Sequence, residues 1–496
     1  MWKIRVGITV ACALALVSCG QPVAPAGTPN VLVSAATDVA LPDTAQAASD
    51  QLTSTNVGAV TTVTLPLIFN STFANSIFGV ETTSITGTEL SLLQQSGASW
   101  VRRNGLIWSG VEPTEGARNW NSLGALEQEM ITASNNGLHL ILVVRSTPYW
   151  AQKNPITPAG PSCGAVDASK FGAYGAFLHD AVARYSVPPY NVKFWEIGNE
   201  PDVDPAYFSA PNQDSIFGCM GDRTDPYYGG GHYGQMLQAI YPLIKSANPM
   251  AQVLTGGLLL DHPISSCPAG TVGNSDMACF FEGILRSGGA AGFDGVSFHA
   301  YDYFAAGLGK YLNGNWQTAW NTTGPVIIRK AHFLKSLIQN YGVTGKYIMV
   351  GETALLCGRC TELDPVSQAT KAQYLAQLYA AAISEDISAV LYYDMQGSWN
   401  QSQLYSSASQ DPFHAYIAAQ AQLAGMQVLT EVTSYPGVMG YSFLNGSQPV
   451  TVLWSLDGAT HSVTLPAMPS TLIDYLGLSL SPTLSISVGL QPIFIH

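Results

Sequence analysis

Charged side chains are scarce in this sequence, at 11% of 496 residues, and basic ones are the scarcer kind. Twenty lysines and arginines against 33 acids leave a formal net charge of −13. This balance argues against nucleic acid or an anionic membrane surface as the main partner, and less firmly against a polyanionic substrate. Hydrophobic residues make up 47%, which is enough for a large core, and the length predicts one large domain with a smaller one.

The sequence lacks a complete motif for binding a dinucleotide and a complete motif for binding zinc. No Gly-rich GxGxxG turn follows the first predicted strand, which disfavours a dinucleotide-binding, doubly wound sheet. The CGRC segment from Cys357 to Cys360 could be half of a zinc site, but the chain offers no second CxxC motif and no nearby histidine pair to complete one. We therefore expect no metal and no cofactor.

The N-terminus is typical of an export signal. Lys3 and Arg5 precede the apolar run VGITVACALALV, whose length suits a signal peptide rather than a membrane span. The run ends in LVSC, which resembles the lipobox of bacterial lipoproteins and implies removal of residues 1–18 and lipidation of Cys19. The alternative is a plain signal peptide with an incidental cysteine, which would give a secreted protein. Residues 19–60, rich in Ala, Pro, Thr and Ser, are expected to form a flexible tether in the cell envelope.

Export also predicts an oxidising compartment. Outside the signal and Cys19, six cysteines remain, an even number that fits three disulfides. Proximity and elimination pair Cys267 with Cys279, Cys357 with Cys360, and Cys163 with Cys219.

Eight short apolar runs alternate with amphipathic helical stretches in the middle of the chain. Apolar residues in these stretches recur at three- and four-residue steps, as in residues 171–185 and 233–247. Alternating strands and helices imply a parallel sheet, and eight units imply a (β/α)₈ TIM barrel, with an open doubly wound sheet as the rival. The runs are residues 76–84, 98–106, 138–146, 192–200, 251–259, 293–301, 346–353 and 387–395.

Residues 425–496 have a different pattern, with short alternating strands broken by NG, DG and PG turns. They predict a small C-terminal all-β domain, a β-sandwich, while residues 61–424 hold the barrel. Residues 61–69 are a candidate for an extra strand in the smaller domain.

Two acids stand where barrel enzymes place their catalytic groups, at the carboxyl ends of strands. The fourth run ends in Glu200, just before Pro201, and the seventh places Glu352 in the equivalent position. Two carboxylates that face each other across a cleft are what cleavage of a glycosidic bond requires. Strand alternation puts Glu196 on the same side as Glu200, and we expect Glu196 to be the buried partner of a barrel arginine.

The segment WEIGNEPD, residues 195–202, resembles the acid/base signature of clan A glycoside hydrolases. Family 39 is the nearest in character and family 5 comes next; residues 100–120, 146–151 and 298–301 and the C-terminal domain resemble matching parts of such enzymes. The resemblance implies a retaining double displacement with Glu200 as general acid/base and Glu352 as nucleophile.

Further site residues follow from strand position within this resemblance. Asn199 is expected to bind the sugar 2-hydroxyl, and His299 is a further candidate for substrate binding. Tyr301, which points the same way as His299, is expected to bind substrate and to donate to Glu352. Arg102 is expected to steady Glu352, with Arg103 as its competitor.

Aromatic residues complete the predicted cleft. Trp399, which follows the eighth run, is expected to be the platform beneath the sugar, and Trp150 and Tyr149 to form a wall. Trp108 is expected in the wall or the core rather than in contact with the ligand.

The sequence thus predicts an exported, membrane-tethered retaining glycoside hydrolase that acts on an oligo- or polysaccharide. A non-catalytic carbohydrate-binding lipoprotein on the same scaffold is one alternative, although the presence of both acids weighs against it. A transglycosylase is another, because it uses the same residues and differs only in the acceptor.

Overall fold

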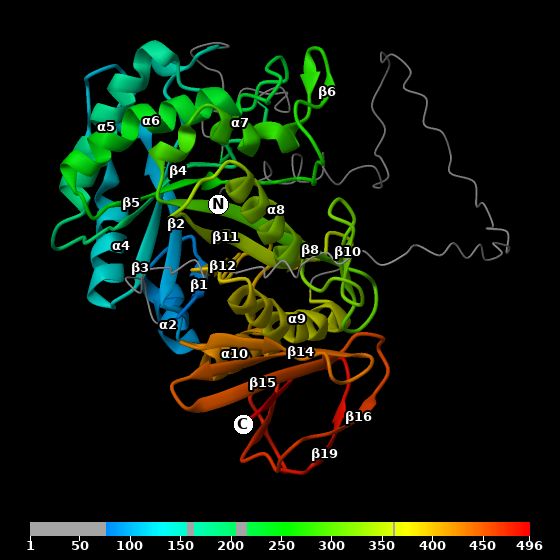
Figure 1. The fold of residues 1–496 in the computed structure, drawn as a ribbon. Coiled ribbons are helices and arrows are strands. Elements are labelled where there is room, and N and C mark those ends of the chain that lie inside the picture. Colours follow the sequence, from blue (N-terminus) through cyan, green and yellow to red (C-terminus); the bar gives the residue numbers. More distant parts are fainter. Residues whose placement is uncertain (1–75, 156–162, 205–215, 361–362) are drawn as a thin grey trace, which may run out of the picture. The chain divides into compact units, whose positions relative to one another are not determined.

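The computed structural model describes residues 76–155, 163–204, 216–360 and 363–496, and this part of the chain contains the predicted barrel (Figure 1). Eight parallel strands lie side by side, and pairing of β5 with β8 closes the ring, which excludes an open doubly wound sheet. The barrel strands are β1 (Phe78–Glu81), β2 (Trp100–Ile107), β3 (His139–Arg145), β4 (Phe194–Asn199), β5 (Gln252–Gly257), β8 (Gly295–Phe304), β11 (Tyr347–Leu356) and β12 (Val390–Tyr392).

Helices between these strands cover the outside of the ring. In α5 the buried residues Tyr174, Phe177, Leu178, Ala181 and Val182 recur at three- and four-residue steps and form one apolar face. The principal helices are α2 (Gly87–Ser96), α4 (Gly124–Asn135), α5 (Phe171–Tyr185), α6 (Gly230–Ala247), α7 (Phe280–Arg286), α8 (Val326–Asn340), α9 (Pro365–Ser384) and α10 (Asp411–Leu423).

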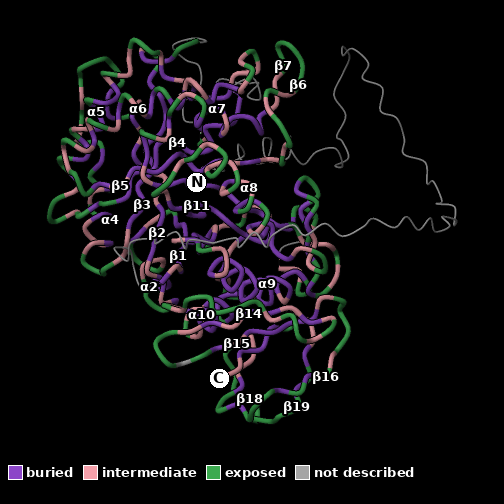
Figure 2. The backbone as a smooth tube through the Cα atoms, viewed as in Figure 1, coloured by how far each residue is buried: buried purple, intermediate pink, exposed green. Residues whose placement is uncertain are grey.

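The barrel interior is a packed core and not a channel. Side chains from six strands or their immediate flanks meet in it, and Figure 2 shows the strands as mostly buried. This cluster consists of Trp100, Ile141, Phe194, Leu254, Tyr347, Met349, Ala389 and Leu391. The apolar filling lies nearer the amino ends of the strands, so polar side chains can gather at the carboxyl ends.

Disulfides join loops at the carboxyl ends of the strands, and their pairing is the predicted one. Cys163 pairs with Cys219, which ties the loop after β3 to the loop after β4. The loop after β5 carries a bridge from Cys267 to Cys279. The bridge from Cys357 to Cys360 follows β11 directly.

The C-terminal region forms the predicted β-domain from two antiparallel sheets. Strands β14 (Val438–Asn445) and β15 (Gln448–Ser455) are joined at the predicted NG turn, where Gly446 has a φ of 60°. The larger sheet also holds β13 (Gln427–Glu431), β17 (Leu472–Asp474), β18 (Ser479–Leu480) and β20 (Ile493–Ile495); the smaller holds β16 (His461–Thr464) and β19 (Ser485–Val488).

A shared apolar core joins the two sheets, with side chains such as Leu453 from the larger and Ile486 from the smaller. Strands β13 and β14 pack against α9, whose residues are buried along most of its length. The β-domain therefore shields one outer helix of the barrel.

Several predictions fall on residues outside the described ranges. They concern the signal peptide in residues 1–18, lipidation of Cys19, the tether in residues 19–60, and the extra strand in residues 61–69. Within the ranges described, none of the helices combines the length and the apolar character needed to cross a bilayer.

Candidate active site

The two predicted carboxylates lie close together at the carboxyl ends of their strands. Glu200 directly follows β4 and Glu352 lies in β11, and each is 7% exposed. One oxygen of each carboxylate and one ring nitrogen of His299 all lie within 4.8 Å of one another. The fold thus brings together two acids that lie 152 residues apart in the chain.

A glycine interrupts the strand geometry just before Glu200. Gly198 has a φ of 92° and Glu200 a φ of 46°, so regular alternation ends there. Alternation alone would turn Asn199 away from Glu196. Instead the side chains of both residues accept hydrogen bonds from Arg102 Nη2, each at 2.6 Å.

A second interruption precedes Glu352. The pairing of β11 with β8 shifts between Val350 and Glu352, and the glycine in between is Gly351. A Cβ atom at Gly351 would lie 2.6 Å from Ser297 Oγ, so a larger residue does not fit there without a shift of its neighbours. A glycine thus disturbs the strand geometry just before each carboxylate, Gly198 before Glu200 and Gly351 before Glu352.

Glu352 accepts hydrogen bonds from two strong donors. Arg102 Nη1 donates to its Oε1 at 2.6 Å, and the Tyr301 hydroxyl donates to its Oε2. His299 Nδ1 lies 3.5 Å from the same Oε2. The bond from Arg102 is charge-assisted, so it is stronger than a neutral hydrogen bond and fixes the orientation of the Glu352 side chain.

Arg102 is the centre of the buried polar network. Its side chain is fully buried and also donates to Glu81 and Glu196, and at 2.6 Å to Asn199 Oδ1. Arg103, its competitor in the sequence, pairs with Glu129 instead. The structure therefore places Arg102 and not Arg103 beside Glu352.

Glu196 is the buried partner of a barrel arginine, as expected. It accepts from Arg102 Nη2 at 2.6 Å, from Ser297 Oγ at 2.8 Å and from the backbone N–H of Gly257 at 3.3 Å. A carboxylate with this many donors is fully engaged within the protein.

Glu200 has a different environment. Its side chain is paired with His299, whose Nδ1 lies 2.8 Å from Oε1. Burial raises the pKa of the Glu200 carboxyl to about 7, although the positive charges of Arg102 and Lys330 oppose the rise. Burial also lowers the pKa of His299 to about 4, so the imidazole is neutral. Because a neutral ring nitrogen donates or accepts according to its tautomer, this contact suits Glu200 in both protonation states.

Glu81 is a member of the network that the sequence reading missed. It ends β1, shares Arg102 Nη1 with Glu352, and burial raises its pKa well above the ordinary value while Arg102 opposes the rise. The signal was present, because FGVET has a glutamate followed by a threonine near the end of its apolar run, just as VGET does. Only the pairing of β1 with β2, with Glu81 opposite Arg102, brings the two side chains together.

The predicted aromatic residues fall into two groups. Trp399, half-buried, lies edge-on to Tyr301 at 5.5 Å and to Tyr393 at 5.6 Å between ring centroids, so it adjoins the carboxylate pair. Trp150 donates its indole N–H to the Glu112 carbonyl and packs edge-on against Trp108. Trp150 thus packs against residues 108–112 and not against Glu200 or Glu352.

Tyr149 and Trp108 differ sharply in exposure. Tyr149 is 40% exposed and is free to form a wall, whereas Trp108 is 1% exposed. Trp108 stacks on Tyr174 and Phe177 of α5, which makes it a core residue, as expected.

In the part of the chain that the structure describes, Glu200, His299 and Glu352 are the one group of acids and histidines close enough to hold a metal ion. The same atoms already have partners, and the Arg102 guanidinium lies 2.6 Å from Glu352. A fixed positive charge at that distance opposes a bound cation, so the donor set fits an acid/base pair better than a metal site.

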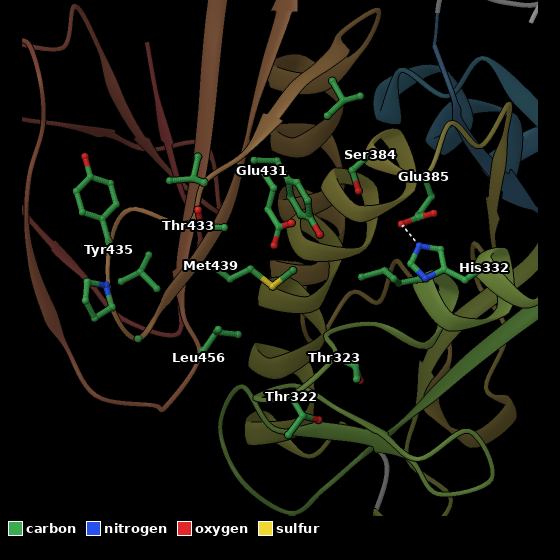
Figure 3. Close-up of a pocket in the computed structure, with 17 residues that line it drawn as sticks. Thr322, Thr323, His332, Ser384, Glu385, Glu431, Thr433, Tyr435, Met439 and Leu456 are labelled. Atoms are coloured by element: carbon green, nitrogen blue, oxygen red, sulfur yellow. Dashed lines mark hydrogen bonds and ion pairs between the residues drawn. The ribbon is translucent and has the colours of Figure 1, made fainter. Parts of the chain in front are cut away.

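A pocket of about 680 Å³ lies elsewhere, between helices α8 and α9 of the barrel and strands β13 and β14 (Figure 3). Its lining includes Thr322, His332, Glu385, Glu431 and Tyr435. The ion pair between His332 and Glu385 is visible in it. None of the site residues above lines this pocket, so we place the chemistry at the carboxylate pair and not in this pocket.

No protein-family model and no curated protein matches this sequence. Solved structures match it by fold. A family 39 glycoside hydrolase from the gut symbiont Bacteroides cellulosilyticus WH2 aligns with a TM-score of 0.61 at 18% identity, over 85% of this chain and 82% of that one. The chain has the fold of clan A glycoside hydrolases.

Two further structures agree. A GH30 endoxylanase from Clostridium papyrosolvens C71 aligns with a TM-score of 0.53 at 13% identity, over 85% of this chain and 96% of that one. A GH86 protein in complex with neoagarooctaose aligns with a TM-score of 0.54 at 11% identity, over 85% of this chain and 74% of that one. The predicted resemblance in fold, with a family 39 enzyme among the matches, is confirmed.

Proposed function

We propose that the protein is a retaining glycoside hydrolase with Glu352 as nucleophile and Glu200 as general acid/base. The observation that carries the proposal is the pair itself: two carboxyl groups whose oxygens approach within 4.8 Å, of which Glu200 has a raised pKa and Glu352 accepts a hydrogen bond from a guanidinium. Retaining enzymes hold their carboxyl groups about 5–5.5 Å apart, whereas inverting ones leave about 6.5–9.5 Å for a water. The short separation favours the retaining route.

In the first step, Glu352 attacks the anomeric carbon and the bond to the leaving oxygen breaks. Glu200 gives its proton to that oxygen, so the aglycone departs as a neutral alcohol. Burial raises the pKa of Glu200 to about 7, so a large share of the molecules carries this proton near neutral pH. In the second step, the ionised Glu200 takes a proton from water, whose oxygen attacks the anomeric carbon and releases Glu352.

Neighbouring donors assist the nucleophile. Arg102 and Tyr301 orient Glu352 and stabilise it when it leaves as a carboxylate. Asn199 Oδ1 accepts from Arg102, and one N–H of its amide donates to the Ile216 carbonyl at 2.9 Å. The amide has a second N–H, which is suited to the sugar 2-hydroxyl.

The substrate we propose is a neutral oligo- or polysaccharide, with Trp399 as the stacking platform. The sugar-complexed GH86 neighbour and the endoxylanase neighbour support the class of substrate. The net charge of −13 disfavours a polyanionic chain. A transglycosylase would use the same pair, whereas a purely carbohydrate-binding protein has no need for an acid whose pKa is raised to about 7.

A panel of aryl α- and β-glycosides and neutral polysaccharides tests the proposal. We expect hydrolysis of at least one glycoside, and NMR of the first product should show the anomeric configuration of the substrate. An inverted first product would contradict the retaining mechanism. Added alcohol acceptors would separate hydrolysis from transfer, and binding to a polysaccharide without turnover of any substrate would favour the non-catalytic alternative.

We also propose that the protein is exported and held at the envelope by a lipid on Cys19. Three disulfides support an oxidising location. Cys19→Ser should release the protein from the membrane fraction of its host, with Cys12→Ser as the matched control. Unchanged fractionation of Cys19→Ser would contradict the lipid anchor.

A further inference from the structure

The loop that follows β12 is closed on itself and carries Trp399. Backbone hydrogen bonds from Leu404 to Asp394, at 2.8 Å, and from Tyr405 to Met395, at 2.9 Å, join its two ends. Within the loop, the Asp394 carboxylate accepts from the Gly397 N–H at 2.8 Å. Residues 394–405, which we name the Trp399 loop, thus form a compact unit at the carboxyl end of the barrel.

Two residues next to Trp399 adopt a backbone conformation that non-glycine residues rarely take. Asn400 has a φ of 46° and Gln401 a φ of 56°. Such strained positions persist where surrounding contacts over-determine them, and they concentrate at functional sites. The contacts that hold this turn therefore affect the position of Trp399.

A buried lysine, Lys371, supplies the contacts that hold this turn. Lys371 of α9 is fully buried, and its Nζ donates to the carbonyl of Gln401, to the carbonyl of Gln403 at 2.9 Å and to Gln368 Oε1 at 3.4 Å. Three acceptors match the three N–H groups of an ammonium. Burial lowers the pKa of Lys371 to about 7, with the nearby Asp394 opposing the change.

The turn held by Lys371 is connected to both sides of the site. Trp399 contacts Tyr301 edge-on at 5.5 Å, and Tyr301 donates to Glu352. The backbone N–H of Cys357 donates to the carbonyl of Asn400 at 2.8 Å, which ties the turn to the loop after the Glu352 strand. A displacement of the turn would therefore move Trp399 relative to the carboxylate pair.

We propose that Lys371 is a positioning residue, which holds the left-handed turn at Asn400 and Gln401 and thereby fixes the Trp399 ring over the site. The proposal rests on the glycosidase function for its effect on rate, but its effect on the loop is independent of it. A purely packing role does not require a charge, because an apolar side chain of similar length would fill the same space without the cost of burying an ammonium. An apolar residue would remove the donor that Lys371 supplies to the carbonyls of Gln401 and Gln403.

The test compares Lys371→Met with Lys335→Met. Lys335 of α8 also donates to a backbone carbonyl, that of Glu385, but Glu385 lines the pocket of Figure 3 and not the site. Hydrogen exchange of the peptide over residues 394–405 should become faster in Lys371→Met and stay unchanged in Lys335→Met. Catalytic efficiency, kcat/KM, should fall about 10- to 100-fold in Lys371→Met, because small errors of position near the reacting atoms have effects of this size.

A double mutant separates positioning from general destabilisation. In a Trp399→Ala background, Lys371→Met should cause little further loss of kcat/KM. An equal loss in both backgrounds, or unchanged exchange in the Trp399 loop, would overturn the proposal. Lys371→Gln, which retains amide donors without charge, provides a second variant and should lie between wild type and Lys371→Met in both measurements. If no glycoside is hydrolysed even by the wild type, the proposed function fails while the exchange data still decide the role of Lys371.

Discussion

Glu352 and Glu200 are the same residue type, equally buried and only a few ångströms apart, yet their surroundings differ. Glu352 accepts hydrogen bonds from a guanidinium and a phenol, whereas Glu200 faces a neutral imidazole in an otherwise desolvated position. Burial raises the pKa of Glu200, whereas the guanidinium and the phenol fix the orientation of Glu352. One small volume thus holds a carboxyl group suited to proton transfer and a second one oriented by fixed donors, the division of roles that glycoside cleavage needs.

The largest loss of activity is expected when Glu352 is replaced. Glu352→Ala should lower kcat by about 10⁴-fold or more, in the range seen when a covalent nucleophile is removed. Azide should restore part of the rate and give a glycosyl azide of inverted configuration, because the small anion occupies the vacated space. A variant with wild-type turnover on a true substrate would contradict the assignment of the nucleophile.

On the Glu200 side, Glu200→Gln should lower kcat by about 10²- to 10⁴-fold, the usual contribution of a general acid. Wild-type kcat/KM should fall as pH rises through about 7, because the raised pKa of Glu200 sets the pH at which its proton is lost. Glu200→Gln should lack this alkaline limb. An unchanged limb in that variant would assign the titration to another group and would remove the asymmetry between the two acids.

A smaller effect is expected from the bridge beside the Glu352 strand. Cys357 and Cys360 close a ring with a sequence separation of only 3, so its loss should hardly change the melting temperature. The bridge restrains the loop that contacts the Trp399 loop, and we expect Cys357→Ser with Cys360→Ser to lower kcat/KM by about tenfold.

The matched control is the bridge in the loop after β5. Its cysteines have a sequence separation of 12, so Cys267→Ser with Cys279→Ser should lower the melting temperature more and turnover less. The reverse order of effects, or non-reducing peptide maps that link Cys357 to another cysteine, would contradict a local role for the bridge.

The smallest effect concerns Lys330, whose positive charge lowers the pKa of Glu200. Its Nζ donates to the carbonyls of Leu259 and His299, each at 2.8 Å, and it is fully buried behind the site. Removal of the charge in Lys330→Met should raise the pKa of Glu200, so the alkaline limb should move to higher pH by less than about one unit. Lys335→Met should leave the limb in place, and a downward shift in Lys330→Met would contradict the electrostatic argument.

Local sequence patterns were sufficient to predict the barrel and the approximate bounds of its strands. The eight apolar runs became the eight parallel strands, and Glu200 directly follows β4 as predicted, whereas β11 continues to Leu356, past Glu352. Both results depend on spacing along the chain, which the sequence states directly. The disulfide pairs also followed from proximity, because two of the three close short loops.

Contacts between distant strands had to come from the tertiary structure. Arg102 lies 94 residues from Glu196 and 250 from Glu352, and nothing local distinguishes it from Arg103. Glu81 joins the same network only through the pairing of β1 with β2.

Backbone geometry accounts for the rest. Asn199 turns toward Arg102 because Gly198 breaks the alternation that the sequence pattern assumes. Lys371 looks like any helical lysine in the sequence, but in the fold its amine lies under the Trp399 loop. Periodicity determines which elements form; register, closure of the ring and the few left-handed residues decide which side chains meet, because these depend on contacts that no local pattern records.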